Sequence, residues 1–502
     1  MNSILEMVEE TAARCPESPA VTDPSGSRTY GQLIDDARRA GSFLIGQGVK
    51  ASNPVVITLE KSCGAVTLLY AVLYAGAFYV FVDLRQPPAR VRKLLDKIQP
   101  SAVIALPRQD PLLAEAGWEG KIFHPEEMLR CSVQVEALKA VRDKSTMTDP
   151  LYGIFTSGSS GFPKCVEVSH DAAWRFIGHF TEIFGIRSTD RIGNQAPFDF
   201  DVSVKDIYSA AMTGAELVLI PAEYFIMPKL LLDYLAEKRV SVLIWAVSAL
   251  CLLSERHGFD YRTPETVRLV MFSGEVMPMV QLRRWMQALP RTTFVNLYGP
   301  SEITCNCTYY RVENPEAEEL PIGRPFPGRT IRLYDKSGRI IHKPMERGEI
   351  CIGGESVSDG YWRDPEKTAE KFTDINDNGT MLRMYHSGDI GYFDTDGLLH
   401  YCGRDDAQIK HMGHRIELGE IETAAMSLPG VIRACCFFDR AANRILCAYT
   451  GNLPAASMRQ GLKRALPAYM IPQKIVPVES FRLNAHGKLD REAVRKRLEE
   501  MV

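Results

Sequence analysis

The segment Ile154-Phe-Thr-Ser-Gly-Ser-Ser-Gly-Phe-Pro-Lys164 decides how the rest of this chain is interpreted. It lies between two apolar stretches, residues 151–155 and 166–170, so it is expected to be a polar loop joining buried segments. Glycines let the backbone approach an anion, hydroxyl and N–H groups bind its oxygens, and a lysine neutralises its charge. The loop is therefore a candidate phosphate site. Its candidate ligands are Thr156, Ser157, Gly158, Ser159, Ser160, Gly161 and Lys164.

This loop is not a Walker A loop. That pattern requires G-x-x-x-x-G-K-[ST], whereas Gly161 is followed by Phe-Pro-Lys-Cys. A run of serine and glycine is more often a plain surface turn. The fixed order T-S-G-S-S-G-F-P-K is much more specific than such a run, and it favours phosphate binding.

Outside the loop, helical patterns alternate with short apolar runs, which predicts parallel sheets with crossover helices. The runs lie at 54–59, 79–82, 102–106, 216–220, 241–245 and 267–272. From Arg329 the runs at 331–335, 348–354 and 398–403 have Gly/Asp turns and predict an antiparallel or barrel-like unit. A helix around 417–427, strands at 431–438 and 445–449, and a basic helix near the end are expected after them. The 502 residues correspond to about three domain-sized units.

The composition is that of a globular protein. Apolar residues make up 45% and charged residues 24%, which excludes a disordered, collagenous or disulfide-stapled chain. Lys and Arg number 59 against 62 Asp and Glu, so a general nucleic-acid binder is not expected. The 12 cysteines include no C-x-x-C pair and are expected to be buried free thiols of a cytoplasmic protein.

One stretch has the length of a membrane span. Residues 63–82 carry no charge, but Gly76 divides them and the second part is rich in β-branched and aromatic residues. We expect a buried helix, a glycine break and a buried strand, and no membrane insertion. The amino terminus has acidic residues where a signal peptide needs a basic start.

Further motifs follow the loop in a fixed order. They are Asn296-Leu-Tyr-Gly-Pro-Ser-Glu302, His386-Ser-Gly-Asp-Ile-Gly391, residues 401–422 beginning Tyr-Cys-Gly-Arg-Asp-Asp, Leu466-Pro-Ala-Tyr-Met-Ile-Pro472 and Asn484-Ala-His-Gly-Lys-Leu-Asp-Arg491. With the loop, this series resembles the adenylate-forming superfamily of acyl-CoA synthetases, luciferases and adenylation domains of nonribosomal peptide synthesis. The resemblance runs from about Arg28 to Arg491. Cys165 departs from it, because the family commonly has glycine there.

The resemblance implies a site for ATP and Mg²⁺. Tyr298 is expected to stack on adenine, Ser301 to bind the α-phosphate and Asp389 to accept hydrogen bonds from the ribose hydroxyls. Glu302 is the expected Mg²⁺ ligand. The nucleotide-binding candidates beyond the loop are Gly274, Glu275, Asn296, Tyr298, Gly299, Ser301, Asp389, Arg404 and Lys488.

The resemblance also implies two domains and two half-reactions. A large α/β domain, residues 1–402, of layered subdomains with a barrel-like part holds ATP and substrate. A small mobile α+β lid, residues 403–502, carries Lys488, the principal catalytic residue, which acts with Lys164 and Arg404. Rotation about the hinge residue Asp406 then admits a thiol to the acyl-adenylate.

The implied substrate is an amino acid, because Asp201 matches the carboxylate that pairs with the α-ammonium in amino-acid-activating members. Asp199 and Asp206 are interpreted as surface charges. Lys205 either pairs with a carboxylate of the substrate or extends outward to solvent, and both remain open. The remaining pocket candidates are Phe200, at the position of an aromatic gate, and Val202, Ala246, Met271, Ser273, Leu297, Cys305 and Asn306, with Lys488 at its edge.

Within the superfamily, residues 194–208 and 271–278 look closest to D-alanine:carrier-protein ligases, so D-alanine is one candidate among small amino acids. The expected partner is a separate holo carrier protein with a phosphopantetheine arm. Such carriers are typically acidic, while residues 403–502 carry a net charge of +5. The chain is expected to be a monomer. An acyl- or aryl-CoA synthetase and a non-catalytic adenylate-binding homologue are the alternatives.

Overall fold

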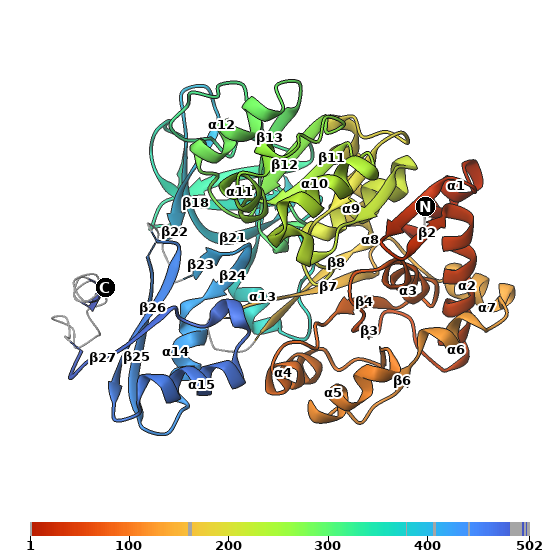
Figure 1. Cartoon of the computed structure of the whole chain (residues 1–502), viewed down its shortest axis with the longest axis horizontal. Coiled ribbons are helices and arrows are strands. Elements are labelled where there is room, and N and C mark those ends of the chain that lie inside the picture. Colours follow the sequence, from red (N-terminus) through yellow and green to blue (C-terminus); the bar gives the residue numbers. More distant parts are fainter. Residues whose placement is uncertain are drawn as a thin grey trace.

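The computed structural model describes residues 3–158, 163–377, 379–404, 408–439, 442–481, 494–495 and 498. Two large sheets form most of it (Figure 1). The nine-stranded sheet has the order β15 (Arg324–Pro325), β14 (Thr308–Arg311), β13 (Thr293–Tyr298), β12 (Leu269–Ser273), β11 (Val242–Ala246), β9 (Arg191–Asn194), β10 (Glu216–Leu219), β1 (Pro19–Asp23) and β2 (Gly26–Thr29). The seven-stranded sheet has the order β19 (Gly360–Tyr361), β8 (Lys164–Ser169), β7 (Pro150–Thr156), β4 (Phe78–Phe81), β3 (Pro54–Ile57), β5 (Ala102–Ile104) and β6 (Ile122–Phe123).

Helices connect and cover these strands. Those preceding the phosphate loop are α1 (Leu5–Arg14), α2 (Tyr30–Gly46), α3 (Cys63–Tyr74), α4 (Pro88–Ile98), α5 (Asp110–Glu115), α6 (Pro125–Leu129) and α7 (Val135–Arg142). Those following it are α8 (His170–Phe184), α9 (Val202–Thr213), α10 (Pro228–Glu237), α11 (Val247–Glu255) and α12 (Met279–Ala288). The predicted parallel pairing is confirmed: β3–β4, β9–β10 and β11–β12–β13 are all parallel.

The long uncharged stretch is core. It forms α3, a turn at Gly76 with φ +72° and then β4. Helix α3 contacts β1 of one large sheet and β3 and β4 of the other, which explains why it is apolar on every face. A side chain at Gly76 would clash with Val141, since an added Cβ lies 2.6 Å from Val141 Cγ1. No helix in the described ranges is long and apolar enough to cross a membrane.

A third sheet is antiparallel, as the turn-rich sequence predicts. Its strands are β17 (Ile340–Ile341), β16 (Arg329–Tyr334), β18 (Gly348–Gly354), β21 (Thr380–Phe393) and β20 (Phe372–Asp377), with β22 (Leu399–Arg404) paired to β21 and α13 (Pro365–Lys371) beside them. Arg404, beyond the expected domain boundary at residue 402, still pairs within this sheet, opposite Asp389.

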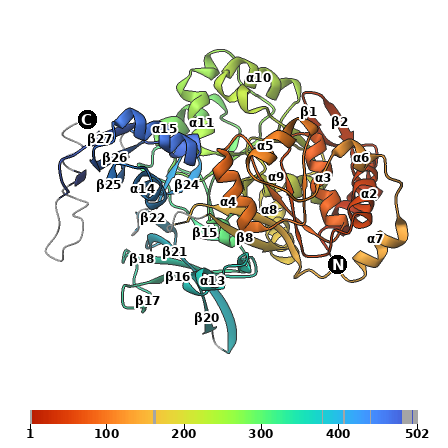
Figure 2. The same cartoon turned by 90° about the horizontal axis from the view of Figure 1, so that it is seen from below.

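The carboxyl-terminal elements lie on the side of the molecule opposite α2 and α7 (Figures 1 and 2). They comprise α14 (Leu418–Met426), α15 (Ala455–Ala465) and a sheet of β25 (Val431–Asp439), β26 (Arg444–Gly451) and β27 (Lys474–Pro477). A separate hairpin, β23 (Gln408–His411) with β24 (His414–Glu417), precedes them. The helix and two strands predicted here are confirmed. The basic helix expected near the end falls largely outside the described residues.

Candidate active site

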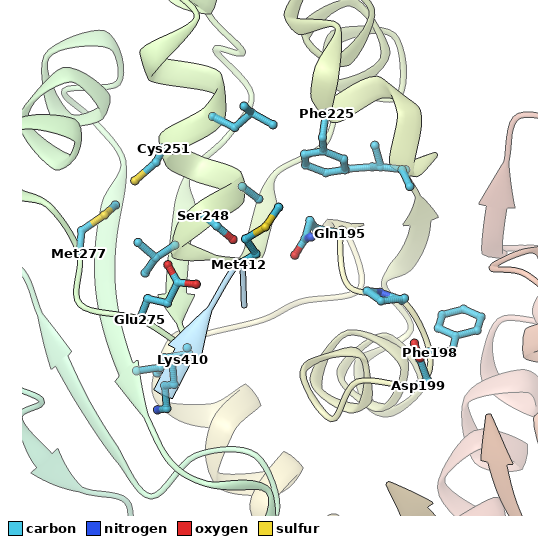
Figure 3. Close-up of a pocket in the computed structure, with 18 of the residues that line it drawn as sticks. Gln195, Phe198, Asp199, Phe225, Ser248, Cys251, Glu275, Met277, Lys410 and Met412 are labelled. Atoms are coloured by element: carbon cyan, nitrogen blue, oxygen red, sulfur yellow. The ribbon is translucent and has the colours of Figure 1, made fainter. Parts of the chain in front are cut away.

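A cavity of about 1150 Å³ opens where β11, β12 and β13 end. The carboxyl ends of parallel strands meet at one edge of a sheet, and ligands bind at such an edge in open α/β folds. Figure 3 shows Glu275, Ser248, Gln195 and Met412 grouped around this cavity. Six sequence-predicted residues line it: Gly274, Glu275, Asn296, Leu297, Tyr298 and Arg404.

Three of the expected nucleotide-binding residues contact one another directly. Asp389 is buried; one carboxylate oxygen accepts from the Tyr298 hydroxyl at 2.5 Å, and the other from the Arg404 guanidinium at 2.5 Å. The second Arg404 nitrogen donates to the Ser387 carbonyl at 2.9 Å. Tyr298 and Arg404, which come from two different motifs, therefore both bind the Asp389 carboxylate of a third.

Close backbone packing shapes the loop after β13. An added Cβ on Gly299 would lie 2.5 Å from the Asn306 Cα and 2.7 Å from the Cys305 carbonyl oxygen. Glycine is therefore required there so that residues 305–307 can fold back against the strand. Asn296, on β13, donates its side-chain amide to the Pro321 carbonyl at 2.9 Å.

Glu302 is fully buried in a cationic setting. Its carboxylate accepts two hydrogen bonds from Arg415, at 3.0 and 2.8 Å, and one from the Tyr361 hydroxyl at 2.7 Å. Burial alone would raise the pKa of Glu302, but Arg415 and the Lys164 ammonium outweigh it and hold the pKa at about 2. Glu302 is therefore an anion at any physiological pH.

The part of the phosphate loop that the structure describes lies beside Glu302 through Lys164. The Lys164 ammonium lies 4.9 Å from the centre of the Tyr361 ring, and the buried Thr156 hydroxyl has no hydrogen-bond partner within the described residues. Ser157 donates to the Arg415 carbonyl at 2.8 Å. The Cys165 side chain points away, into the core against Gly153. Ser159, Ser160 and Gly161 lie outside the described residues, as do Asp406 and Lys488.

The hairpin β23–β24 brings two cations that the sequence reasoning missed. Arg415 binds Glu302, and the Lys410 ammonium lies 5.4 Å from the centre of the Tyr298 ring, on which adenine is expected to stack. The Gly413 amide donates to Glu275 at 2.5 Å. Residues 408–417 carry a sequence signal for the hairpin, because a glycine between two short alternating apolar-polar runs is typical of one. In the structure Gly413 lies in the turn with φ +79°.

Phe200 also contacts this hairpin. Its ring packs edge-on against His414, with 4.6 Å between ring centres. The ring of Tyr469 stacks on His414, with 3.5 Å between ring centres. The predicted aromatic gate thus contacts the carboxyl-terminal hairpin in this arrangement.

The predicted substrate residues surround the start of α9. Asp201 is the half-buried N-cap residue of α9, and Val202 is the helix's first residue. Ala246 and Ser273 are paired neighbours at the ends of β11 and β12, with Met271 two residues earlier. The Cys305 thiol donates to the Asp201 carbonyl at 3.1 Å. Burial raises the pKa of Asp201, against the opposing effects of Ser301 and Lys205.

Lys205 does not extend to solvent, so that alternative is wrong. It is fully buried, and its ammonium donates to the Asn306 side-chain oxygen at 2.7 Å. No carboxylate lies within 4 Å of this ammonium among the described residues. Burial lowers the pKa of Lys205, although Cys305 and the carboxylates of Asp201 and Asp206 act against that change.

The interpretation of Asp206 as a surface charge is also wrong, whereas Asp199 is partly exposed. Asp206 is fully buried and accepts from the Asn194 side chain at 2.6 Å; burial raises its pKa to about 7. Asp199 lines the cavity, and burial raises its pKa to about 6. A helix whose polar residues are buried in the protein, as those of α9 are, cannot be distinguished by spacing from one whose polar residues face water.

Most of the chain matches a known family. A model described as AMP-binding enzyme matches residues 8–362. This chain belongs to the AMP-binding enzyme family. The matched range includes the phosphate loop, Tyr298 and Glu302, whereas Asp389 and Arg404 lie beyond it.

Relatives of this AMP-binding enzyme cover nearly the whole chain. An L-proline–[L-prolyl-carrier protein] ligase of Streptomyces coelicolor is 30% identical over 97% of this chain and 95% of its own length. Tyrocidine synthase 1 of Brevibacillus parabrevis is 30% identical over 98% of this chain and 45% of its own length. The chain spans between 8% and 45% of the length of the first five curated relatives.

A solved structure shows the same fold. PA1221, an NRPS protein containing adenylation and PCP domains, superposes with a TM-score of 0.83 at 26% identity, covering all of this chain and 98% of that one. The AMP-binding enzyme fold thus includes the carboxyl-terminal elements beyond residue 362 as well as the family-matched region.

In AMP-binding enzymes the nucleotide is ATP, and Glu302 has the chemistry that Mg²⁺ prefers, an ionised oxygen ligand. Among the described residues, the buried Thr156 hydroxyl, paired in register with Lys164, is a further polar group without a partner. In the present arrangement both oxygens of Glu302 are bound by Arg415. Glu302 would hold the ion, and because Arg415 now binds both of its oxygens, metal binding there would require Arg415 to withdraw.

The Glu302–Arg415 pair predicts an acid-sensitive contribution to stability. The pKa of Glu302 falls from an ordinary 4.5 to about 2, so its contribution is complete above pH 4.5 and is lost as the pH falls toward 2. The full contribution is about 3 kcal/mol, at about 1.4 kcal/mol per pKa unit. Urea unfolding of the wild type and of Glu302→Gln at several pH values measures it. Parallel pH profiles for the two proteins would contradict the assignment.

Proposed function

We propose that this protein activates an amino acid with ATP and transfers it to a carrier protein. In the first step a substrate carboxylate oxygen attacks the α-phosphorus of ATP, the bond to pyrophosphate breaks, and an aminoacyl-AMP forms. In the second step a thiolate attacks the acyl carbon and AMP leaves, giving a thioester. The observation that carries this proposal is Asp201, a half-buried carboxylate at the start of α9 whose main chain contacts Cys305 in the loop after β13.

Asp201 favours an amino acid over a simple acid. A carboxylate with a pKa raised by burial is stabilised by a cation, and the α-ammonium of an amino acid is such a cation. A fatty or aryl acid brings no positive charge and would leave this carboxylate uncompensated. The names of the relatives agree with this preference, since one is an amino acid:carrier-protein ligase.

The chain's own residues supply positioning and charge in the first step. We place the ribose on Asp389 and Arg404, and the phosphates between Lys164, Thr156 and Ser301. Glu302 would hold Mg²⁺, which would supply positive charge to the departing pyrophosphate. Lys488 is proposed to bridge the substrate carboxylate and the α-phosphate. Charge neutralisation of this kind dominates catalysis of phosphoryl-type transfers.

The hairpin is proposed to serve the second step. With Arg415 on Glu302, this carboxylate has a cationic partner when no metal ion is bound to it. Lys410 and Arg415 then hold the adenylate's phosphate while the carrier thiol enters. The carrier's phosphopantetheine arm is proposed to enter through the cavity, which Gln195, Ser248 and Met412 line together with Tyr298.

The substrate side chain is proposed to carry a hydrogen-bond acceptor. Lys205 is buried with one hydrogen bond, to Asn306, one helical turn after Asp201. A buried ammonium is costly unless it is paired, and a carboxylate or amide oxygen of the substrate would pair it. This favours a small acidic or amide amino acid over D-alanine, whose methyl group brings no acceptor.

Amino-acid-dependent ATP–pyrophosphate exchange tests the proposal. In a panel of L-, D- and β-amino acids, we expect strong exchange with a few small amino acids whose side chain carries a hydrogen-bond acceptor. Lys205→Met, a change of similar volume, should lower the preference for these over apolar amino acids by about 10–100-fold, the value of a hydrogen bond to a charged group. Asn306→Ala serves as the partner variant and should shift the same preference in the same direction.

The acyl- or aryl-CoA synthetase remains the alternative function. It predicts background exchange with every amino acid and activity with simple acids. The thiol that receives the acyl group separates the two functions independently. A holo carrier protein is expected to receive the acyl group, and free coenzyme A to receive it poorly. Transfer to coenzyme A alone would contradict the proposed partner.

A further inference from the structure

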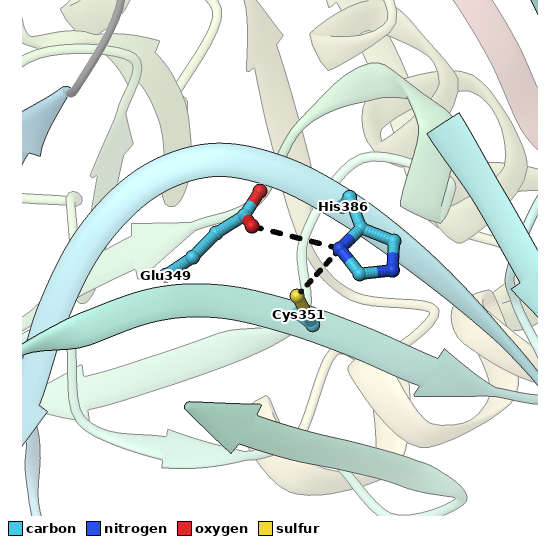
Figure 4. Close-up of side chains that lie close together, drawn as sticks. All are labelled: Glu349, Cys351 and His386. Carbon is cyan, nitrogen blue, oxygen red and sulfur yellow. Dashed lines mark hydrogen bonds and ion pairs between the residues drawn. The ribbon is translucent and has the colours of Figure 1, made fainter. Parts of the chain in front are cut away.

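A cluster of three metal-ligating side chains lies outside the cavity, in the antiparallel sheet (Figure 4). Glu349 and Cys351 occupy alternate positions of β18, and His386 lies on the neighbouring strand β21, directly paired with Cys351. Alternate residues of a strand point to one face, and paired residues of adjacent strands are close neighbours. The sheet register therefore brings a carboxylate, a thiol and an imidazole together.

All three groups converge on one nitrogen. The Cys351 sulfur lies 3.2 Å from the His386 Nδ1, and the Glu349 Oε2 lies 3.5 Å from the same atom. A thiol–imidazole–carboxylate relay would instead use both ring nitrogens, one for each partner. Here the other nitrogen, Nε2, is bound to the Thr373 hydroxyl at 3.0 Å. The arrangement is therefore not that of a catalytic triad.

The spacing is that of ligands around a tetrahedral cation. Zinc bonds of about 2.0 Å to nitrogen, about 2.3 Å to sulfur and about 2.0–2.2 Å to oxygen hold ligand atoms roughly 3.3–3.5 Å apart. The two distances to Nδ1 are close to this, and all three ligand atoms lie within 4.8 Å of one another. Sulfur, imidazole and carboxylate together suit Zn²⁺ better than Mg²⁺ or Ca²⁺.

Outer contacts hold two of the ligands in place. The Gly388 amide donates to Glu349 Oε1 at 2.9 Å, which leaves Oε2 turned toward the cluster. Thr373 fixes the His386 ring through Nε2, so Nδ1 faces the same point. Metal-binding histidines and carboxylates are oriented by such outer contacts. The side chains of His386 and Glu349 are 28% and 31% exposed, so a metal reaches the cluster from solvent.

We propose that Glu349, Cys351 and His386 form a Zn²⁺ site, with a water molecule as fourth ligand. The ion would join β18 to β21 three residues before Asp389. The same strand pair is already held there by the Ser387 hydroxyl, which donates to the Ile350 carbonyl at 2.5 Å. The site would thus fix the segment that presents Asp389, and it would be separate from the Mg²⁺ expected at Glu302. This inference does not depend on the proposed function.

Cobalt titration of the metal-free, untagged full chain tests the site, because Co²⁺ replaces Zn²⁺ and reports its ligands. We expect one equivalent to give the visible bands of tetrahedral Co²⁺ and a near-ultraviolet thiolate-to-cobalt band, both removed by added Zn²⁺. Cys351→Ser should abolish the thiolate band. Cys131→Ser, a matched change at a half-buried thiol far from the cluster in sequence, should retain it.

Two further variants protect the test against misfolding, because Cys351 is buried whereas His386 and Glu349 are partly exposed. Glu349→Gln and His386→Gln should each weaken Co²⁺ binding by at least about tenfold, since even outer-shell changes cost about 10–100-fold. Zn²⁺ should raise the melting temperature of the wild type and not of His386→Gln. A missing thiolate band in the wild type, or one that survives Cys351→Ser, would show a plain hydrogen-bonded cluster and overturn the proposal.

Discussion

Replacing Glu302 by glutamine is expected to slow adenylation by about 10²–10³-fold, the usual loss when one preorganised charge-stabilising group is removed from an active site. Glutamine keeps the shape and the hydrogen bond from Tyr361 but removes the charge that Arg415 binds and that the proposed Mg²⁺ would require. The loss should fall on kcat of ATP–pyrophosphate exchange, with a smaller change in the KM of the amino acid. Raising Mg²⁺ should restore part of the activity if Glu302 is the metal ligand.

Arg415→Gln is the matched variant, because it removes the other half of the same ion pair. If Arg415 serves only the second step, this variant should keep most of its pyrophosphate exchange and lose transfer to the carrier thiol. Removing one partner of a buried ion pair typically destabilises the conformation that contains the pair by about 3–5 kcal/mol. Equal losses in both half-reactions for Arg415→Gln would contradict the division of roles, and unchanged exchange in Glu302→Gln would contradict the metal assignment.

Replacing Asp201 by asparagine is the second large effect. Asparagine preserves volume but cannot neutralise the α-ammonium, so kcat/KM for the preferred amino acid should fall by about 10²–10³-fold, equivalent to about 3–4 kcal/mol for a buried charge left unpaired. The 2-hydroxy analogue of the same acid has no ammonium, so its kcat/KM should change little. Exchange measured with both acids gives the discrimination directly.

Lys205→Met provides the control for the Asp201 experiment. It alters the same helix four residues away but leaves the carboxylate in place, so discrimination between amino and hydroxy acid should persist in it. An equal loss of kcat/KM for the amino acid and its hydroxy analogue in Asp201→Asn would indicate damage to the pocket and not loss of the ammonium contact. Thermal unfolding of both variants separates that outcome from a change in recognition.

The sequence predicted the layered sheets because their signals are local. The uncharged stretch of α3 and β4 and the apolar runs of β10, β11 and β12 are legible within windows of a few residues. Motif order placed Tyr298 and Asp389 in one site although 91 residues separate them. No pattern in the chain itself links these two residues; only the family resemblance does.

The features that were missed depend on three-dimensional packing. The contact of Arg415 with Glu302 spans 113 residues and depends on how the hairpin docks, which hydrophobic periodicity does not encode. The inward direction of Lys205 and the burial of Asp206 depend on which face of α9 meets the strand ends. The Glu349–Cys351–His386 cluster depends on strand register, which the sequence leaves open.

The three sheets of the amino-terminal part share one hydrophobic core, in which Tyr79, Val295 and Ile350 come from different sheets. Ile421, Cys447 and Leu462 belong instead to a separate core in the carboxyl-terminal elements. Replacing a segment of the first part would divide this shared core, whereas the carboxyl-terminal elements have an interior of their own. Reorienting them requires the breaking of polar and aromatic contacts such as Glu302–Arg415 and Phe200–His414, with little apolar core exposed to water.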